Sequence, residues 1–171
     1  MKIAITDANI FIDLFYLEFV HHLFEIDCEI YTTRNVILEL ENHHADQLNL
    51  FIENKKLKIE SLNSSDQLSM IRLRKNRGLS ESDLSVICVA ERLQAIVLSG
   101  DDLVRKTCHI QMIEVHGVLW CFDQFVLKKK ITKAVACDQL KELMKYNKRL
   151  PVKDCKKYIT EKWNGSFDEI E

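Results

Sequence analysis

Four acidic residues of this chain stand where their carboxylates could act together on one ligand. Asp7 and Asp101 each follow a short apolar run that predicts a buried strand, and Asp83 stands near the start of a predicted helix. Glu39 lies within the apolar run 36–40, early in another predicted helix. Because ligands of parallel α/β sheets bind beyond the carboxyl ends of the strands, we expect these four carboxylates to meet at one rim.

Helix caps offer a simpler explanation for three of the four acids. Ser80 and Asp83 fit a capping box, with Ser80 as the N-cap, and Asp7 and Asp101 precede predicted helices. Glu39 has no such explanation, although a solvated helix face could carry it. Like charges gathered at one rim would repel one another and raise each other's pKa, and a hard divalent cation would offset that repulsion. The joint arrangement therefore favours a Mg²⁺ or Mn²⁺ site over isolated caps.

The elements that must position these acids alternate between strand and helix. Strands are predicted at 2–6, 29–33, 57–60, 95–99 and 111–115. Helices are predicted at about 8–20, 35–51, 64–76 (with Gly78 as its C-cap), 103–109, 118–129, 133–146 and 152–163, with one more between residues 80 and 95. This order implies an α/β fold: a parallel sheet of four to five strands flanked by helices, with extra C-terminal helices. We expect residues 1–130 to form this domain and residues 131–171 to be a helical extension packed on it.

The charge balance limits how the chain could bind nucleic acid. Its 171 residues favour one domain, and a formal net charge of −2 gives no overall attraction to phosphates. Any such contact must come from a local patch. The best local candidate is the basic end of the helix at 64–76, which leads into the loop carrying Asp83, although such a run is most often a solvated helix end. Its basic residues are Arg72, Arg74, Lys75 and Arg77.

Cysteine and histidine usage does not predict zinc. The six cysteines are scattered without a C-x-x-C pair, which favours reduced core thiols in a reducing compartment. The adjacent pairs His21-His22 and His43-His44 are not expected to face one metal ion from a helix, although His43 could support Glu39 from one turn away. The sequence has no Gly-rich phosphate loop, basic leader or apolar run of membrane-spanning length. A cytoplasmic protein without membrane contact is expected.

The acidic positions resemble those of a known family. The run Thr6–Leu14, TDANIFIDL, resembles the opening motif of PIN-domain ribonucleases. Three further stretches are similar to the later acidic positions of that family, in the same order: Val36–Leu40, Gly78–Asp83 and Leu98–Asp101. In the last of these, Ser99 stands where the family has Thr. The resemblance covers about residues 1–120.

This resemblance implies a ribonuclease whose acidic pocket binds Mg²⁺ or Mn²⁺. The implied ligands are Asp7, Glu39, Asp83 and Asp101. Metal ions there would lower the pKa of a bound water and align it with an RNA phosphodiester, with Asn9 and Ser99 orienting the ligands through hydrogen bonds. In the Asp101-Asp102 doublet, we expect Asp101 to be the ligand and Asp102 to support it as the cap of the next helix.

The resemblance also implies partners. Many bacterial members of the family are toxins of toxin–antitoxin pairs and commonly form dimers. The expected partners are therefore an RNA substrate, a small antitoxin protein and a second copy of the chain. The alternative is a PIN-like module that binds RNA or protein without catalysis. Aspartyl-phosphate phosphatases are disfavoured because they need a second Asp where this chain has Asn9, and receiver domains need an early acidic pair and a later strand-end Lys that are both missing.

Overall fold

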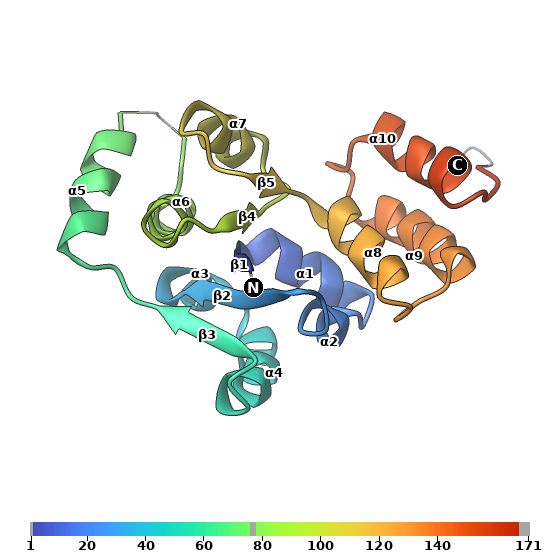
Figure 1. The fold of residues 1–171 in the computed structure, drawn as a ribbon, viewed down its shortest axis with the longest axis horizontal. Coiled ribbons are helices and arrows are strands. Elements are labelled where there is room, and N and C mark those ends of the chain that lie inside the picture. Colours follow the sequence, from blue (N-terminus) through green and yellow to red (C-terminus); the bar gives the residue numbers. More distant parts are fainter. Residues whose placement is uncertain (1, 76–77, 168–171) are drawn as a thin grey trace.

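The computed structural model describes residues 2–75 and 78–167, which contain a five-stranded, fully parallel sheet (Figure 1). Its strands are β1 (Lys2–Thr6), β2 (Cys28–Thr33), β3 (Leu57–Glu60), β4 (Ile96–Leu98) and β5 (Val115–His116). The spatial order is β3-β2-β1-β4-β5. The chain therefore builds outward from β1 in one direction and then in the other, which makes the β1–β4 boundary the point where the strand order reverses. In open parallel sheets, ligands bind at the carboxyl end of such a boundary. The predicted fold class is confirmed.

Helices cover the sheet and extend beyond it. They are α1 (Ala8–Tyr16), α2 (Val20–Leu23), α3 (Arg34–Glu39), α4 (Asn42–Glu53), α5 (Ser64–Leu73), α6 (Glu81–Leu93), α7 (Asp102–Ile110), α8 (Val118–Leu127), α9 (Lys133–Tyr146) and α10 (Val152–Lys157), with a π-helical turn at Tyr158–Lys162. Helix α6 contacts β1, β2 and β4 and is buried from Leu84 to Ala90. Its nearly continuous apolar sequence fits this position between the sheet and the neighbouring helices.

The predicted helix at 35–51 is interrupted, and the interruption changes the position of Glu39. Leu40 and Glu41 both have a ψ of 147°, which is extended backbone, so α3 ends at Glu39 and α4 begins at Asn42. The extended backbone allows the Leu40 side chain to reach the core, where it is 6% exposed. Glu39 therefore ends a short helix instead of lying within a long one.

Two other predicted boundaries differ because the chain turns through a positive φ. The helix expected at 8–20 stops at Tyr16, and Glu18 follows with a φ of 59°. The strand expected at 111–115 is reduced to Val115–His116, because Met112 has a φ of 56° in the turn that closes α7. Neither turn contains a glycine or a proline, so the sequence carries no sign of it.

The turn before α6 also differs from its prediction. The helix at 64–76 ends at Leu73 with Arg74 as its C-cap, so Gly78 is not that cap. Gly78 has a φ of +108° and lies just before the start of α6. A residue with a Cβ is strained at this φ, and its Cβ would lie 3.0 Å from a Leu103 methyl carbon.

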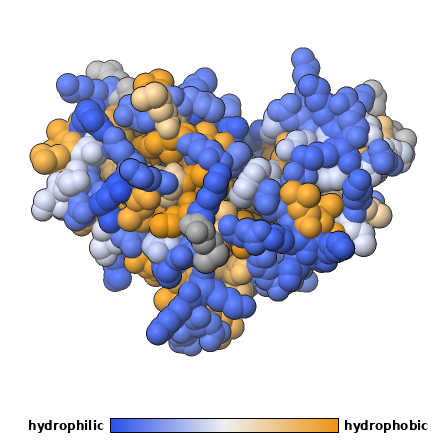
Figure 2. All heavy atoms as spheres, in the orientation of Figure 1, coloured by the Kyte–Doolittle hydropathy of each residue, from blue (hydrophilic) through white to orange (hydrophobic). Residues whose placement is uncertain are grey.

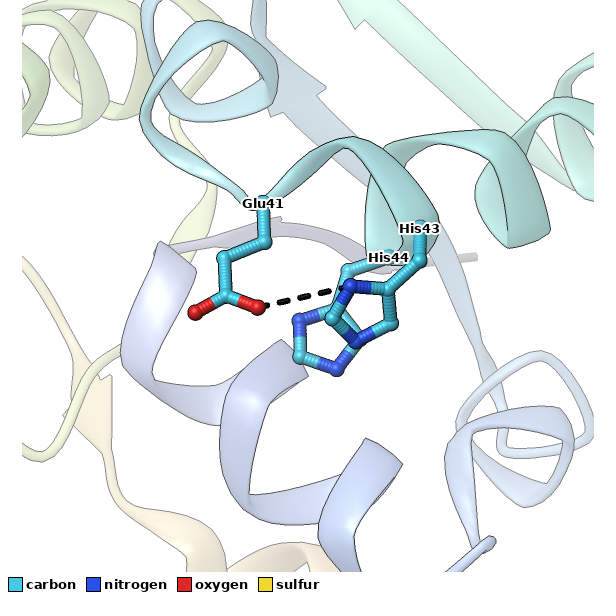
Figure 3. A group of neighbouring side chains, drawn as sticks. All are labelled: Glu41, His43 and His44. Carbon is cyan, nitrogen blue, oxygen red and sulfur yellow. Dashed lines mark ion pairs between the residues drawn. The ribbon is translucent and has the colours of Figure 1, made fainter.

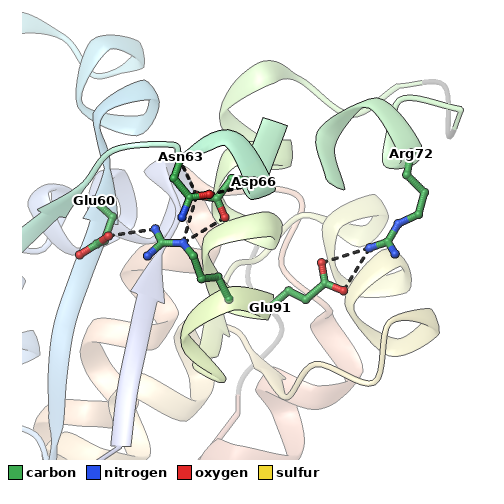
Figure 4. Close-up of polar contacts among 6 residues, drawn as sticks. Glu60, Asn63, Asp66, Arg72 and Glu91 are labelled. Carbon is green, nitrogen blue, oxygen red and sulfur yellow. Dashed lines mark hydrogen bonds and ion pairs between the residues drawn. The ribbon is translucent and has the colours of Figure 1, made fainter. Parts of the chain in front are cut away.

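A buried carboxylate connects α5 to α6. Asp66 is 1% exposed, and the Arg92 Nε donates to both of its oxygens at 3.1 Å (Figure 4). The same guanidinium donates to Glu60 at 2.9 Å. The Arg72–Glu91 ion pair links the same two helices at the surface, with both N–O distances at 3.1 Å. A buried carboxylate needs such a partner, whereas the exposed pair adds little to stability.

The C-terminal helices contact α1 and α8. The Asn147 side-chain amide donates to both carboxylate oxygens of Asp13 at 3.0 and 3.1 Å, and Tyr146 stacks on Tyr16 with ring centroids 3.9 Å apart. On the face shown in Figure 2, a notch separates these helices from the rest of the molecule, and apolar areas are interrupted by hydrophilic side chains. All six cysteines are free, and five are buried. None of the described helices is long and apolar enough to cross a membrane.

Candidate metal and active site

Asp7 is the centre of a buried hydrogen-bond network at the carboxyl end of β1. Its side chain is 2% exposed and accepts from the Ala8 N–H at 2.7 Å, which caps α1. Oδ2 accepts from the Asn9 side-chain amide at 2.6 Å and from the Ser99 hydroxyl at 2.8 Å. The Asn9 Oδ1 in turn accepts from the Gly100 N–H at 2.8 Å. Asn9 and Ser99 thus fix the Asp7 carboxylate across the β1–β4 boundary.

Asp101 is the N-cap of α7 and lies beside this network. Its Oδ1 accepts from the N–H groups of Leu103 and Val104 at 2.8 and 3.0 Å, and its own N–H donates to the Ser99 hydroxyl at 3.2 Å. Neither cap bond uses Oδ2. Asp102 is the exposed first residue of the helix, so the prediction that Asp102 is the cap is wrong. Asp101 has the extended backbone that an N-cap requires.

Asp83 lies in the first turn of α6, where the predicted capping box is confirmed. Its Oδ2 accepts from the Ser80 N–H at 2.7 Å, and its N–H donates to the Ser80 hydroxyl at 3.0 Å. The Oδ1 atom takes no part in the box. Because residues Leu84–Ala90 of α6 are buried and the helix contacts β1, β2 and β4, the core fixes the position of this first turn.

Glu39 is exposed at the end of α3 and takes no part in a helix cap. The start of α3 is anchored by Thr33, whose hydroxyl accepts from the Val36 N–H at 3.2 Å. The same hydroxyl lies 2.6 Å from the Ser85 hydroxyl of α6, in a buried contact. This contact holds α3 against α6 and brings Glu39 to the edge where Asp83 lies.

The structure brings the four acids close enough for their charges to interact. The pKa of Asp7 is raised to about 6, chiefly by burial and in part by the charges of Asp83 and Glu39, against the opposing Ser99 hydrogen bond. Burial also raises the pKa of Asp83, and the charges of Asp101 and Glu39 add to that rise. Three of the acids cap helices, so their individual positions have a structural cause. Their shared electrostatic environment is what separates them from ordinary caps.

The donor set fits a hard cation that keeps part of its water shell. The four acids do not lie close enough together to bind one ion through three direct contacts. Within residues 2–75 and 78–167, one group of three His, Cys, Asp or Glu side chains has ligand atoms within 4.8 Å of one another, and it includes none of these acids. Mg²⁺ usually binds one or two carboxylates directly and retains several waters, which suits oxygen ligands at this wider spacing. The Thr6 and Ser82 hydroxyls, directly before Asp7 and Asp83, are buried without a hydrogen-bond partner among the described residues.

The basic run at the end of α5 is partly occupied by intramolecular ion pairs. Arg72 pairs with Glu91, and Arg74 pairs with Glu81 at 2.7 and 2.8 Å. Both arginine side chains remain more than half exposed. Lys75 is exposed, and Arg77 lies outside the described residues.

Two features of the structure, one beside the acidic pocket and one outside it, were not predicted from the sequence. The Arg105 guanidinium donates to the Ser99 carbonyl at 3.3 Å, and its only sequence signal is its position one turn after Asp101. The other feature is the group of three noted above, which consists of Glu41, His43 and His44. The prediction that adjacent histidines cannot face one metal ion is therefore wrong for this pair. Their ring centroids are 4.0 Å apart, because both rings turn toward the same side at the start of α4.

Comparisons with known proteins support this description. The family model DUF3368, described as a PIN domain, matches residues 3–163. Two similar solved structures are VapBC-1 from nontypeable Haemophilus influenzae (TM-score 0.50) and VapBC2 from Rickettsia felis bound to a DNA fragment from their promoter (TM-score 0.48). Each matched chain is 16% identical, and the match covers 68% of this chain and 98% of the other. At this identity, the likeness concerns the fold alone. A search of curated proteins found no match.

Proposed function

This chain belongs to the PIN-domain family, and from that premise we propose that it is a metal-dependent ribonuclease. The observation that supports the proposal is that the charges of four acids, which come from four elements near the end of β1, act on one another. Burial and the neighbouring negative charges raise the pKa of Asp7 to about 6. Such a group of acids is unfavourable for stability alone, and a divalent cation removes the repulsion.

The proposed mechanism uses the four acids as metal ligands and two neighbouring polar residues to orient Asp7. The residues that would hold Mg²⁺ or Mn²⁺ are Asp7, Glu39, Asp83 and Asp101. When bound, such ions lower the pKa of a coordinated water and offset negative charge on the phosphodiester. Asp101 offers Oδ2 and Asp83 offers Oδ1, because their helix caps use the other oxygen. Asn9 and Ser99 hold the Asp7 carboxylate in one orientation toward the rim.

We further propose that RNA phosphates contact the basic run at the end of α5. Exposed ion pairs such as Arg72–Glu91 and Arg74–Glu81 are worth roughly 0–1 kcal/mol, so a phosphate can replace the carboxylate at small cost. Lys75 and Arg77 belong to the same run. Because these contacts are to the phosphate backbone, their loss should weaken binding to all RNA sequences alike and reduce its salt dependence.

Cleavage of RNA with and without Mn²⁺ tests the nuclease proposal. Asp7→Asn should reduce the single-turnover cleavage rate by at least about 100-fold, since even supporting residues of metal sites cost 10–100-fold. Asp13→Asn is the matched control, because Asp13 is a second buried aspartate of α1, its pKa is also raised to about 6 by burial, and it contacts Asn147 instead of the pocket. Equal cleavage by Asp7→Asn and the parent protein would show that the assignment is wrong.

The rival proposal is a PIN-like module that binds RNA or protein without catalysis. The helix caps at Asp7, Asp83 and Asp101 favour it, because they explain three acids without a metal ion. Calorimetric titration with Mn²⁺ separates the two proposals. The nuclease predicts metal-dependent heat that is lost in Asp83→Ala, whereas the module predicts no such heat from the parent protein.

We propose that the chain is a cytoplasmic toxin with a small antitoxin partner. It would act as a homodimer, and the helices after residue 130 would extend its nuclease domain. Induced expression should then arrest growth, and the Asp7→Asn protein should not. Light scattering of the purified protein would report the dimer. Growth arrest by both proteins would separate toxicity from the acidic pocket.

A further inference from the structure

A second cluster of possible metal ligands lies outside the acidic pocket, at the start of α4. Glu41 is the N-cap residue of this helix, and His43 and His44 lie in its first turn. One ligand atom from each of the three side chains lies within 4.8 Å of the other two. Figure 3 shows both imidazole rings turned toward the Glu41 carboxylate, with His43 Nδ1 3.3 Å from a carboxylate oxygen. Two nitrogens and one carboxylate oxygen therefore face a common volume.

His44 adds an observation that an ordinary surface ion pair does not explain. Its Nδ1 atom is buried and has no hydrogen-bond partner among the described residues. Its ring is held by Phe15 of α1, which stacks on it at a centroid distance of 4.4 Å and an interplanar angle of 6°. Buried polar atoms are normally satisfied, and this ring has one nitrogen that is not, in a side chain that also places a ligand atom within 4.8 Å of those of Glu41 and His43.

The chain contains an internal comparison for this cluster. His21 and His22 are also adjacent on a helix, with ring centroids 3.9 Å apart and the same interplanar angle of 48°. The carboxylate of Glu25 pairs with His22 at 3.4 Å and also with Lys130 at 3.4 Å. A cation there would have to displace the lysine. Adjacency of two histidines alone therefore does not produce the arrangement seen at Glu41.

We propose that Glu41, His43 and His44 form a binding site for a Zn²⁺-class transition metal ion. Two imidazoles and one carboxylate are a ligand set that suits Zn²⁺, with a fourth position left for water. Imidazole ligands also select against Mg²⁺ and Mn²⁺, which prefer oxygen. The site differs in chemistry from the all-carboxylate pocket. An ion bound there would hold the turn between α3 and α4, which begins directly after Glu39.

Calorimetric titration of the full chain with Zn²⁺ tests the proposal, with Co²⁺ absorption as a second readout of the ligand set. The test variants are Glu41→Gln and His43→Ala, whose side chains are 76% and 60% exposed, so neither change threatens the fold. Each should weaken Zn²⁺ binding by at least about tenfold, since changes even outside the ligand set cost 10–100-fold at metal sites. His21→Ala is the matched control and should bind Zn²⁺ as the parent does.

The acidic pocket supplies the control that separates this proposal from the ribonuclease. Asp7→Asn should keep the Zn²⁺ site, and Glu41→Gln should keep Mn²⁺-dependent cleavage. The proposal is overturned if the parent protein gives no heat with Zn²⁺, which would leave only a surface ion pair. It is also overturned if Zn²⁺ binding survives unchanged in both Glu41→Gln and His43→Ala, which would place the ion on the cysteines or the acidic pocket. Neither outcome depends on whether the chain cleaves RNA.

Discussion

Replacing Asp7 by Asn should stabilise the metal-free protein increasingly as the pH rises, although it removes the central carboxylate of the site. Burial raises the pKa of Asp7 from 3.8 to about 6. Between these values, the folded protein binds more protons than the unfolded chain, so its stability falls as the pH rises through this window. At 1.36 kcal/mol per pKa unit, the loss reaches about 3 kcal/mol above pH 6. The asparagine side chain of the Asp7→Asn variant has no charge to bury, so the variant does not undergo this loss.

The asparagine also changes hydrogen bonds, and the design of the experiment must separate the two effects. Asp7 accepts from Asn9 and from Ser99, and losing part of a charged hydrogen bond costs roughly 1.5–3 kcal/mol at any pH where it is formed. The change of the unfolding free-energy difference with pH, rather than its value at one pH, therefore reports the burial of the charge. This difference should move in favour of the variant by about 2.4 kcal/mol between pH 4 and pH 7.5, because about 0.6 kcal/mol of the total of about 3 kcal/mol is already lost at pH 4.

Urea denaturation in EDTA at a series of pH values measures this change. Asp102→Asn is the control, because it removes the charge of an exposed carboxylate one position from Asp101 without removing a buried one. Adding Mn²⁺ at pH 7.5 should shift the difference back toward the parent, since an ion at 100 times its dissociation constant stabilises the parent by about 2.7 kcal/mol and does not stabilise the variant. A difference between Asp7→Asn and parent that changes by less than about 1 kcal/mol over this pH range would refute the argument from burial.

Three further substitutions test other parts of the structure. Arg92→Ala should destabilise the fold by about 3–5 kcal/mol, because it leaves the buried Asp66 carboxylate without its cation. Arg72→Ala removes only the exposed ion pair with Glu91 and should cost less than about 1 kcal/mol. Equal losses of unfolding free energy in chemical denaturation would contradict this distinction between the buried and the exposed pair. Gly78→Ala should cost roughly 1–3 kcal/mol because of the positive φ, and an unchanged melting temperature would exclude that strain. Ser99→Ala should lower the RNA cleavage rate about 10–100-fold. It should also shift the pH dependence of cleavage to higher pH, because the Ser99 hydrogen bond lowers the pKa of Asp7. A lower rate with an unchanged pH dependence would contradict the role of Ser99 in setting that pKa.

Much of the fold could be predicted because its elements depend on local patterns. The apolar run at 2–6 became β1 and the helix at 133–146 became α9, with the predicted bounds. The capping box of Ser80 and Asp83 was also predictable, because its residue types and spacing determine its hydrogen bonds. Alternation of strands and helices then restricted the topology to a parallel sheet.

The remaining features depend on tertiary contacts that leave no local pattern. The break between α3 and α4 accompanies the burial of Leu40, and no proline or glycine at the break predicts it from the sequence. Asp101 caps α7 in place of Asp102 because the Ser99 hydroxyl fixes the Asp101 N–H, a contact that follows the end of β4. The orientation of His44 is set by Phe15 on a different helix. Such contacts depend on how the elements pack together, so local sequence patterns do not predict them.

The central claim is that the acids at the sheet edge hold metal ions for RNA cleavage, and Asp101 allows its most direct test. Single-turnover cleavage of RNA in Mn²⁺ should be compared for Asp101→Asn and Asp102→Asn. Asparagine caps a helix as well as aspartate, so Asp101→Asn keeps the Oδ1 bonds to α7 and loses only the Oδ2 charge. We predict that Asp101→Asn loses cleavage while Asp102→Asn cleaves as the parent does. If both variants cleave RNA at the parental rate, the acidic pocket is not the active site.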